Sequence, residues 1–305
     1  MIRLVLRRLV WGIGVLWLVA TLTFVLLRAA PGGPFDSERQ LPPEIRANVE
    51  AKYRLDDPLW LQYMRYVGGV AQGDLGPSFK YLGRDVSTIL AETFPVSFGL
   101  GMMALSVSVV LGLGFGIAAG HRPRGWIDRG AMVLATAGVA LPNFVLGVAL
   151  VLIVSHQWHW LPPALWEGPR YLVLPALTLG LAPAAYIARL TRSSLLDTSR
   201  QDYVKTAYAK GLSARAVLIG HQLPNALMPV VTVLGPLTAT LITGSFVVEF
   251  LFAVPGMGRF FITAVTNRDY PLIMGVTLLY AGLLVAANLL ADIVSARLDP
   301  RIRIE

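Results

Sequence analysis

The chain has 305 residues, of which 55% are hydrophobic and 14% charged, and its mean hydropathy is +0.62. Soluble domains carry about 25% charged residues, so this composition excludes an ordinary soluble enzyme, and its apolar content excludes a disordered chain. The formal net charge is +8, and the absence of cysteine excludes disulfides and thiolate metal sites. A membrane protein is favoured, with its positive charges concentrated on one side of the bilayer.

Six stretches without Asp, Glu, Lys or Arg are long enough to cross a bilayer, because about 20 apolar residues span about 30 Å as a helix. The sequence therefore predicts an all-α integral membrane protein with six transmembrane helices. Prolines inside these stretches, such as Pro142 and Pro236, favour kinked packing helices over a direct contact with substrate. In chain order the predicted spans are Leu9–Leu27, Val96–Gly120, Ala131–Ser155, Tyr171–Ala188, Ala226–Val248 and Leu272–Ala291.

Small residues in the second predicted span indicate close packing. Gly112, Gly114 and Gly116 follow one another at every second position. Residues without bulky side chains let membrane helices approach closely. We therefore expect this stretch to contact another helix.

Basic residues predict the orientation of the six spans. The segments on the side of the two termini carry 15 Lys and Arg residues, whereas the two short loops on the opposite side carry 3. The long loop 28–95 also lies on that opposite side, but its 8 basic residues accompany nine acids and loops of this length cross largely regardless of charge. We expect both termini in the cytoplasm and no nucleic-acid partner.

Residues 28–95 are predicted to form a small helical module outside the membrane. Pro42-Pro43-Glu44 can begin a helix over Glu44–Leu55, and Asp57 is the candidate N-cap of a second helix. The module can serve as a cap on the spans or as a docking face for an external partner, and the sequence favours neither. The expected apolar face of the second helix consists of Leu59, Tyr63, Tyr66, Val67 and Val70.

The loop 189–225 contains the most specific local pattern. Asp202 suits the start of a helix because its charge complements the helix dipole, and Gly211 stands where a helix-ending glycine is expected. Ser213 can cap a second short helix. A helix–glycine–helix element with a small apolar ridge rimmed by positive charge suits a groove on another protein. The ridge is predicted to consist of Val204, Ala207 and Tyr208.

The residues of this loop match the pattern of a known family. They are Asp202-Tyr203-Val204, Thr206-Ala207, Ala209-Lys210-Gly211-Leu212-Ser213, His221 and Asn225-Ala226-Leu227. The pattern resembles the EAA loop of ABC-importer permeases, with Asp202 in place of the family's first Glu. The resemblance implies that Thr206–Arg215 is a coupling helix seated on a nucleotide-binding subunit. It assigns ATPase coupling to Asp202, Thr206, Ala207, Ala209, Lys210, Gly211, Leu212, Ser213, Arg215 and His221.

Further motifs resemble the peptide-transport branch of this family. They are the stretches Glu249–Gly258, Asn267–Pro271 and Leu298–Arg301, and the run Gly73–Tyr81 is similar to the B subunit of oligopeptide permeases. We expect Glu249 to support the turn that follows, with contact to substrate as the alternative. The gating or turn candidates are Glu249, Pro255, Gly256 and Gly258.

The resemblance covers essentially the whole chain and implies a type I ABC-importer transmembrane domain in the bacterial inner membrane. It implies an ATP-driven importer of oligopeptides, with dipeptides, glutathione or a nickel complex as alternative cargoes and a stand-alone carrier or channel as a remote one. The implied partners are a second homologous permease, two ATP-binding subunits that are two different chains, an extracytoplasmic peptide-binding protein, membrane lipid and the peptide. The expected parts are a cytoplasmic N-terminus and first span (1–27), the outer module (28–95), the permease core (96–293, coupling loop 189–225) and a cytoplasmic tail (294–305).

The sequence shows no pattern for catalysis. Lys205-Thr206 lacks the glycine that precedes the lysine of a phosphate-binding loop, so ATP and Mg are expected on partner chains and no cofactor in this one. His156 and His159 have no obvious third ligand, so no metal site is expected. The six apolar stretches contain no ionisable acid or base, which argues against a proton-coupled carrier. We therefore expect a non-catalytic transport subunit.

Overall fold

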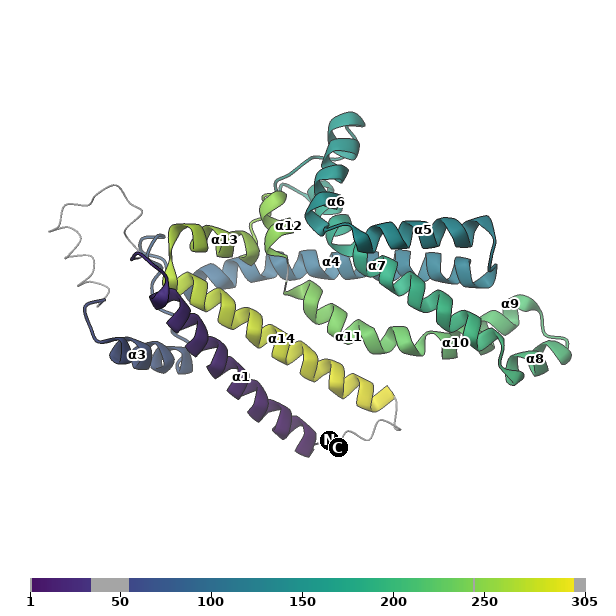
Figure 1. Cartoon of the computed structure of the whole chain (residues 1–305), viewed down its shortest axis with the longest axis horizontal. Helices are drawn as coiled ribbons and strands as arrows, with labels where there is room; N and C mark the ends of the chain where they lie inside the picture. The colour runs from purple at the N-terminus through teal and green to yellow at the C-terminus, as the bar shows by residue number, and fades with distance from the viewer. Residues whose placement is uncertain (1, 34–54, 244, 299–305) are drawn as a thin grey trace. The chain divides into compact units, whose positions relative to one another are not determined.

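The computed structural model describes residues 2–33, 55–243 and 245–298, and this part of the chain is built from helices and the turns between them (Figure 1). The chain divides into two compact units, residues 1–97 with 255–286 and residues 98–254 with 287–305. The helices are α1 (Ile2–Ala29), α3 (Leu59–Ala71), α4 (Val86–His121), α5 (Trp126–Ala140), α6 (Asn143–Leu150), the π-helix η1 (Val151–Gln157), α7 (Pro169–Ser199), α8 (Asp202–Ala209), α9 (Ala214–Val217), the π-helix η2 (Leu218–Gln222), α10 (Leu223–Ala226), α11 (Met228–Ile242), α12 (Phe246–Leu251), α13 (Met257–Asn267) and α14 (Tyr270–Leu298).

Helices long and apolar enough to cross a bilayer confirm the predicted all-α membrane class. Within the described residues four single helices qualify, namely α1, α4, α7 and α14. Two bent pairs, Trp126–Ala140 with Asn143–Gln157 and Ala214–Ala226 with Met228–Ile242, also qualify when their halves are taken together. Counting each bent pair as one span gives up to six, the number predicted from the sequence.

The third predicted span, Ala131–Ser155, is not one continuous helix. α5 ends at Ala140, α6 begins at Asn143, and the two axes differ by 113°. Proline disfavours helical geometry in the residue before it, and Leu141, which precedes Pro142, is extended with ψ 130°. Pro142 therefore ends one helix and begins another, where the sequence predicted a kink.

Other predicted boundaries also differ from the structure, among them the end of the fourth span, because α7 continues past Ala188 to Ser199 and so includes the start of the predicted loop 189–225. The fifth predicted span, Ala226–Val248, is interrupted because α11 ends at Ile242 and α12 begins at Phe246. Ser245 begins α12 by accepting a hydrogen bond from the Val248 amide at 3.3 Å. The helix of the second span begins ten residues before the predicted start at Val96, since α4 starts at Val86 and continues through Pro95.

Glycines allow α4 and α7 to pack backbone against side chain in the unit of residues 98–254 with 287–305. A Cβ at Gly116 would lie 2.6 Å from the Thr191 Cβ, and one at Gly112 would lie 2.6 Å from the Ile187 Cβ. A Cβ at Gly114 would meet nothing within 4 Å. The predicted close approach is therefore confirmed at two of the three glycines, since alternate helical positions point in different directions.

Aromatic contacts hold α3 against α1 in the unit of residues 1–97 with 255–286. The Phe24 ring lies 5.4 Å from that of Tyr63, whose hydroxyl hydrogen-bonds with the Thr21 hydroxyl at 2.6 Å. The predicted second helix of the outer module is thus confirmed. Its N-cap is Pro58, and Asp57 pairs instead with Arg65, so the predicted cap was wrong. The helix predicted over Glu44–Leu55 lies almost wholly outside the described residues.

We predict that Gly116→Leu destabilises the chain while Gly114→Leu, two positions away on the same helix, does not. The leucine at 116 must displace Thr191 and the backbone of α7, and overpacking of this kind costs about 1–3 kcal/mol. Thermal unfolding of the purified proteins in one detergent measures the difference. Equal midpoints for both variants would show that α4 and α7 do not pack through Gly116.

Candidate functional site

The loop from α8 to α9 has the local structure that the sequence predicted. Gly211 is left-handed with φ 82°, and its amide donates to the Tyr208 carbonyl at 2.9 Å while the Leu212 amide donates to the Ala207 carbonyl at 3.3 Å. These two bonds end α8 in the manner of a glycine-terminated helix. Ser213 then caps α9 by accepting from the Ala216 amide at 3.4 Å. The segment Thr206–Arg215 is thus the end of one helix, a glycine turn and the start of another.

The apolar residues of this loop point in two directions, which corrects the predicted ridge. Val204 and Ala207 are buried and form a cluster with Val217 of α9. Tyr208 is 46% exposed, and the other large apolar side chains on the outside are Tyr203 and Leu212. The inner cluster therefore fixes α8 against α9. Tyr203, Tyr208 and Leu212 stay exposed beside this cluster, and we call these three side chains the tyrosine face. Tyr203 and Tyr208 are five positions apart on α8 and so lie on either side of the buried pair.

The same loop exposes basic side chains, which we call its positive rim. Lys205, Lys210 and Arg215 are exposed, and the Lys205 ammonium lies 2.9 Å from the Asp202 carboxylate. This hydrogen bond lowers the pKa of Asp202, but the pair is so exposed that it contributes little to stability. The rim therefore keeps its positive charge available to a partner.

The remaining coupling candidates hold the loop together through backbone groups. The Thr206 hydroxyl donates to the Asp202 carbonyl at 2.9 Å, and the His221 carbonyl in η2 accepts from the Asn225 side-chain amide at 3.0 Å. Ala209 is the last residue of α8, and Lys210 is its C-cap. The structure thus brings Asp202 to Arg215 into one short element, and places His221 in the neighbouring η2.

An ion pair that sequence reasoning missed fastens α5 to α7. Arg192 of α7 donates two hydrogen bonds to the buried Asp128 of α5, one of them from Nη2 to Oδ2 at 2.9 Å. The Arg124 amide also donates to Asp128, at 2.7 Å. The available signal was that Asp128 is the one acid among residues 121–130, but nothing local indicates a partner 64 positions away.

A cavity of about 560 Å³ lies where the two helix breaks meet α7. Its wall includes Asn143 beside the α5–α6 break and Ser245 beside the α11–α12 break, with Tyr186 and Arg189 from α7 and Thr240 from α11. In a bilayer, interrupted backbone is tolerated only where it is buried in protein or lines a water-filled cavity. We call this space the break cavity, and its polar groups were not predicted as site residues.

The gating and turn candidates fall into both units of the chain. Glu249 is fully buried in α12, and its carbonyl accepts from the Val254 amide at 2.9 Å. Pro255 precedes Gly256, the N-cap of α13, and Gly258 is buried in the first turn of that helix. In the unit of residues 1–97 with 255–286, the Met257 amide donates to the Ser97 hydroxyl at 2.9 Å. Support of the turn by Glu249 stays a prediction.

Asp269 joins two motifs that the sequence analysis could only treat separately. Its buried carboxylate accepts from the Ser78 hydroxyl and from the Phe79 amide, the latter at 3.1 Å, so the run Gly73–Tyr81 is held against the start of α14. The Leu272 amide also donates to it, at 3.3 Å, which caps that helix. One carboxylate therefore fixes both motifs in one place.

Comparison with known families identifies this assembly of helices. The model described as "Binding-protein-dependent transport system inner membrane component" matches residues 112–304. The chain belongs to this family. A second model, for the N-terminal part of such membrane components, matches residues 1–100. The apolar helices described above agree with a membrane component.

Curated relatives and solved structures agree with the family. The chain is 46% identical to the dipeptide transport system permease protein DppB of Bacillus subtilis, covering 94% of this chain and 93% of that one. It is 41% identical to the oligopeptide transport system permease protein OppB of Escherichia coli, covering 99% and 100%. A crystal structure of an amino acid ABC transporter has the same fold, with a TM-score of 0.55 and 16% identity over 69% of this chain and 94% of that one.

We predict that Asp269→Ala loosens the run 76–81 of this permease. The change leaves the Ser78 hydroxyl and the buried Leu272 amide without their acceptor, and losing charge-assisted hydrogen bonds costs about 1.5–3 kcal/mol. Hydrogen exchange of residues 76–81 should accelerate, whereas Asp56→Ala, at an exposed aspartate of the same unit, should leave it unchanged. Unaltered exchange in Asp269→Ala would contradict the clamp.

Proposed function

We propose that this chain is one of two membrane-spanning subunits of an ABC importer that carries short peptides into the cytoplasm. Its relatives include permeases named for dipeptide and for oligopeptide transport. In this proposal a binding protein outside delivers the peptide, and two ATP-binding subunits inside supply the energy. The chain itself is a transport subunit without an ATP site, with both termini in the cytoplasm as the positive charges predict.

The observation that carries this proposal is the α8–Gly211–α9 loop. A short element fixed by an inner cluster exposes the tyrosine face and the basic side chains of the positive rim. Aromatic anchors surrounded by charge are typical of energetically important contacts between proteins. The loop also follows α7 directly, and α7 lines the break cavity. A displacement of the loop by a docked ATPase would therefore shift the cavity wall through this one helix.

The break cavity is our candidate for the part of the peptide path that this subunit contributes. It offers an arginine, an asparagine amide and three hydroxyl groups, which suit the carboxylate, carbonyl and amide groups of a peptide. A wall of this kind can hold a peptide backbone weakly without selecting its side chains. An apolar wall alone would leave the peptide's polar groups unsatisfied.

We predict that Gly211→Val uncouples ATP hydrolysis from uptake. A branched side chain is strained at φ 82° by about 1–2 kcal/mol or more, so the tyrosine face should turn away from its partner. Gly220→Val is the matched control, because Gly220 lies exposed in the neighbouring η2, has open space around it and needs no left-handed backbone.

The measurements are copurification of the four-subunit complex, ATPase activity with peptide-loaded binding protein, and uptake of labelled peptide into proteoliposomes. Gly211→Val should still insert in the membrane but lose about tenfold or more of the stimulated hydrolysis and uptake, in line with a disturbed contact of about 1.4 kcal/mol. Gly220→Val should behave as wild type. Normal stimulation of ATP hydrolysis and normal uptake in Gly211→Val would show that this loop is not the coupling element.

We also predict that Arg189→Gln and Asn143→Leu slow peptide uptake several-fold, since each removes a polar group from the break cavity. Arg200→Gln, an exposed arginine just past the end of α7, should have no effect. Initial uptake rates for peptides of two to six residues measure the change and also define the preferred length. Unchanged rates in both cavity variants would place the peptide path elsewhere, while leaving the test of Gly211 intact.

A further inference from the structure

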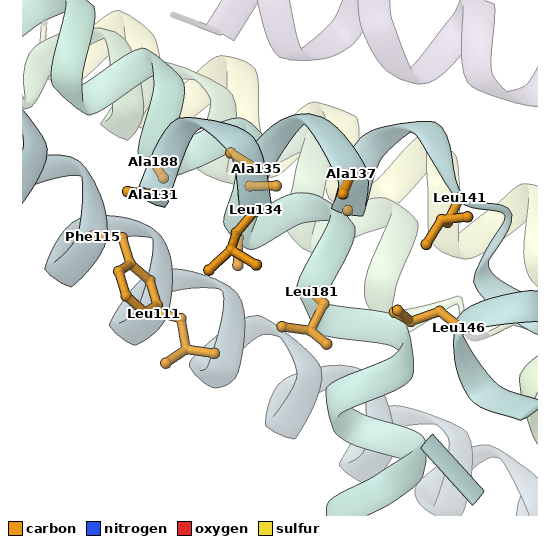
Figure 2. A pocket seen from close by; sticks show the side chains of 13 residues that line it. Leu111, Phe115, Ala131, Leu134, Ala135, Ala137, Leu141, Leu146, Leu181 and Ala188 are labelled. Atoms are coloured by element: carbon orange, nitrogen blue, oxygen red, sulfur yellow. The ribbon is translucent and has the colours of Figure 1, made fainter. Parts of the chain in front are cut away.

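An apolar groove runs between α4 and α5, and its wall consists almost entirely of hydrocarbon side chains. Two adjoining cavities, of about 350 and 510 Å³, share Leu111, Phe115, Ala131 and Leu134 and so form one groove. Figure 2 shows Leu111 and Phe115 on one helix and Leu134 on the other, and every labelled side chain is hydrocarbon. A groove of this composition in a membrane protein accepts an apolar chain.

One end of the groove lies at the turn between α4 and α5. Its lining there includes Ala118, near the end of α4, and Trp126, the first residue of α5, which is 83% exposed. Tryptophan prefers the level of the lipid headgroups, where its ring is apolar and its N–H is solvated. This end of the groove is therefore expected at the membrane–water boundary.

The same turn carries an excess of positive charge. Arg122, Arg124 and Arg129 are all exposed, and the one acid among residues 121–130, Asp128, is buried against Arg192. Asp128 is thus already neutralised by a cation from α7. Arg122 and Arg124 lie in the turn itself and Arg129 lies in the first turns of α5, so a cationic region adjoins the hydrocarbon wall at this end of the groove.

We propose that this groove binds an anionic phospholipid, with one acyl chain along Leu111, Phe115 and Leu134 and the phosphate at the arginines. Guanidinium groups bind phosphate oxygens through paired hydrogen bonds, and basic pockets beside membrane helices select anionic headgroups. Any lipid tail suits the apolar wall, so selection rests on the three arginines.

A helix from another subunit is the alternative occupant, and the structure favours it less. Small residues such as Ala131 and Ala135 would suit helix packing, but both are already buried, at 7% and 4% exposure. Packing of small residues against a helix does not account for the three arginines beside the groove, whereas a phosphate complements them. The lipid therefore accounts for both parts of the site.

The test uses the assembled transporter in nanodiscs of phosphatidylcholine and phosphatidylglycerol. Trace amounts of either lipid carry a photoreactive group on the acyl chain, and mass spectrometry maps the labelled peptides. Phosphatidylglycerol should label residues 110–118 and 130–135 about tenfold more than phosphatidylcholine at equal content, as expected for several arginines near the headgroup. Replacing Arg122, Arg124 and Arg129 together by Gln should abolish this preference.

Two controls separate the groove from general attraction of anionic lipid. Replacing Arg65, Arg84 and Arg170 by Gln removes the same charge elsewhere and should leave the preference intact. Gly114→Leu places a side chain in open space within the groove and should reduce labelling, while Gly99→Leu on the same helix, also in open space, should not. Equal labelling by both lipids, or cross-linking of these residues to the second permease in place of lipid, overturns the proposal.

Discussion

The structure of this permease depends on one constraint, that a backbone in a bilayer must satisfy its own hydrogen bonds. Long uninterrupted helices meet this demand, and α4 and α7 do so over 36 and 31 residues. The chain departs from continuous helix at Leu141–Pro142 and again between Ile242 and Phe246. Both departures border the break cavity, so the irregular backbone is found beside the space that we assign to the peptide.

Local patterns in the sequence predicted the local structure of the α8–Gly211–α9 loop well. Gly211 and Ser213 act through backbone groups within a few residues, so spacing alone was sufficient to place the end of α8 and the start of α9, and Asp202 lies in the first turn of α8 as predicted. The direction of the apolar side chains was predicted less well. Val204 and Ala207 point inward because Val217 supplies a partner from the next helix, and a pattern on one helix does not contain that contact.

Contacts that join distant parts of the chain could not be predicted from the sequence. The pair Asp128–Arg192 and the clamp from Asp269 to Ser78 join residues 64 and 191 positions apart, and single-sequence reasoning offers no register between such segments. The breaks in the third and fifth predicted spans were missed for a related reason. A run of apolar residues indicates that a segment is buried in lipid or protein, but it does not show where the helix breaks. The breaks depend on Pro142 and on the cap at Ser245.

An importer of the proposed kind needs two packings whose balance ATP and peptide can shift, since a ligand moves an equilibrium only by binding one state better. α7 has the mechanical properties for this exchange. From Tyr186 to Ser199 it contains no proline and measures about 20 Å, with Pro183 before this stretch and the non-helical Gln201 after it. This stretch is therefore a stiff helical segment with a flexible point at each end. In an importer of this kind, a displacement of α8 would shift the cavity wall without first bending the helix.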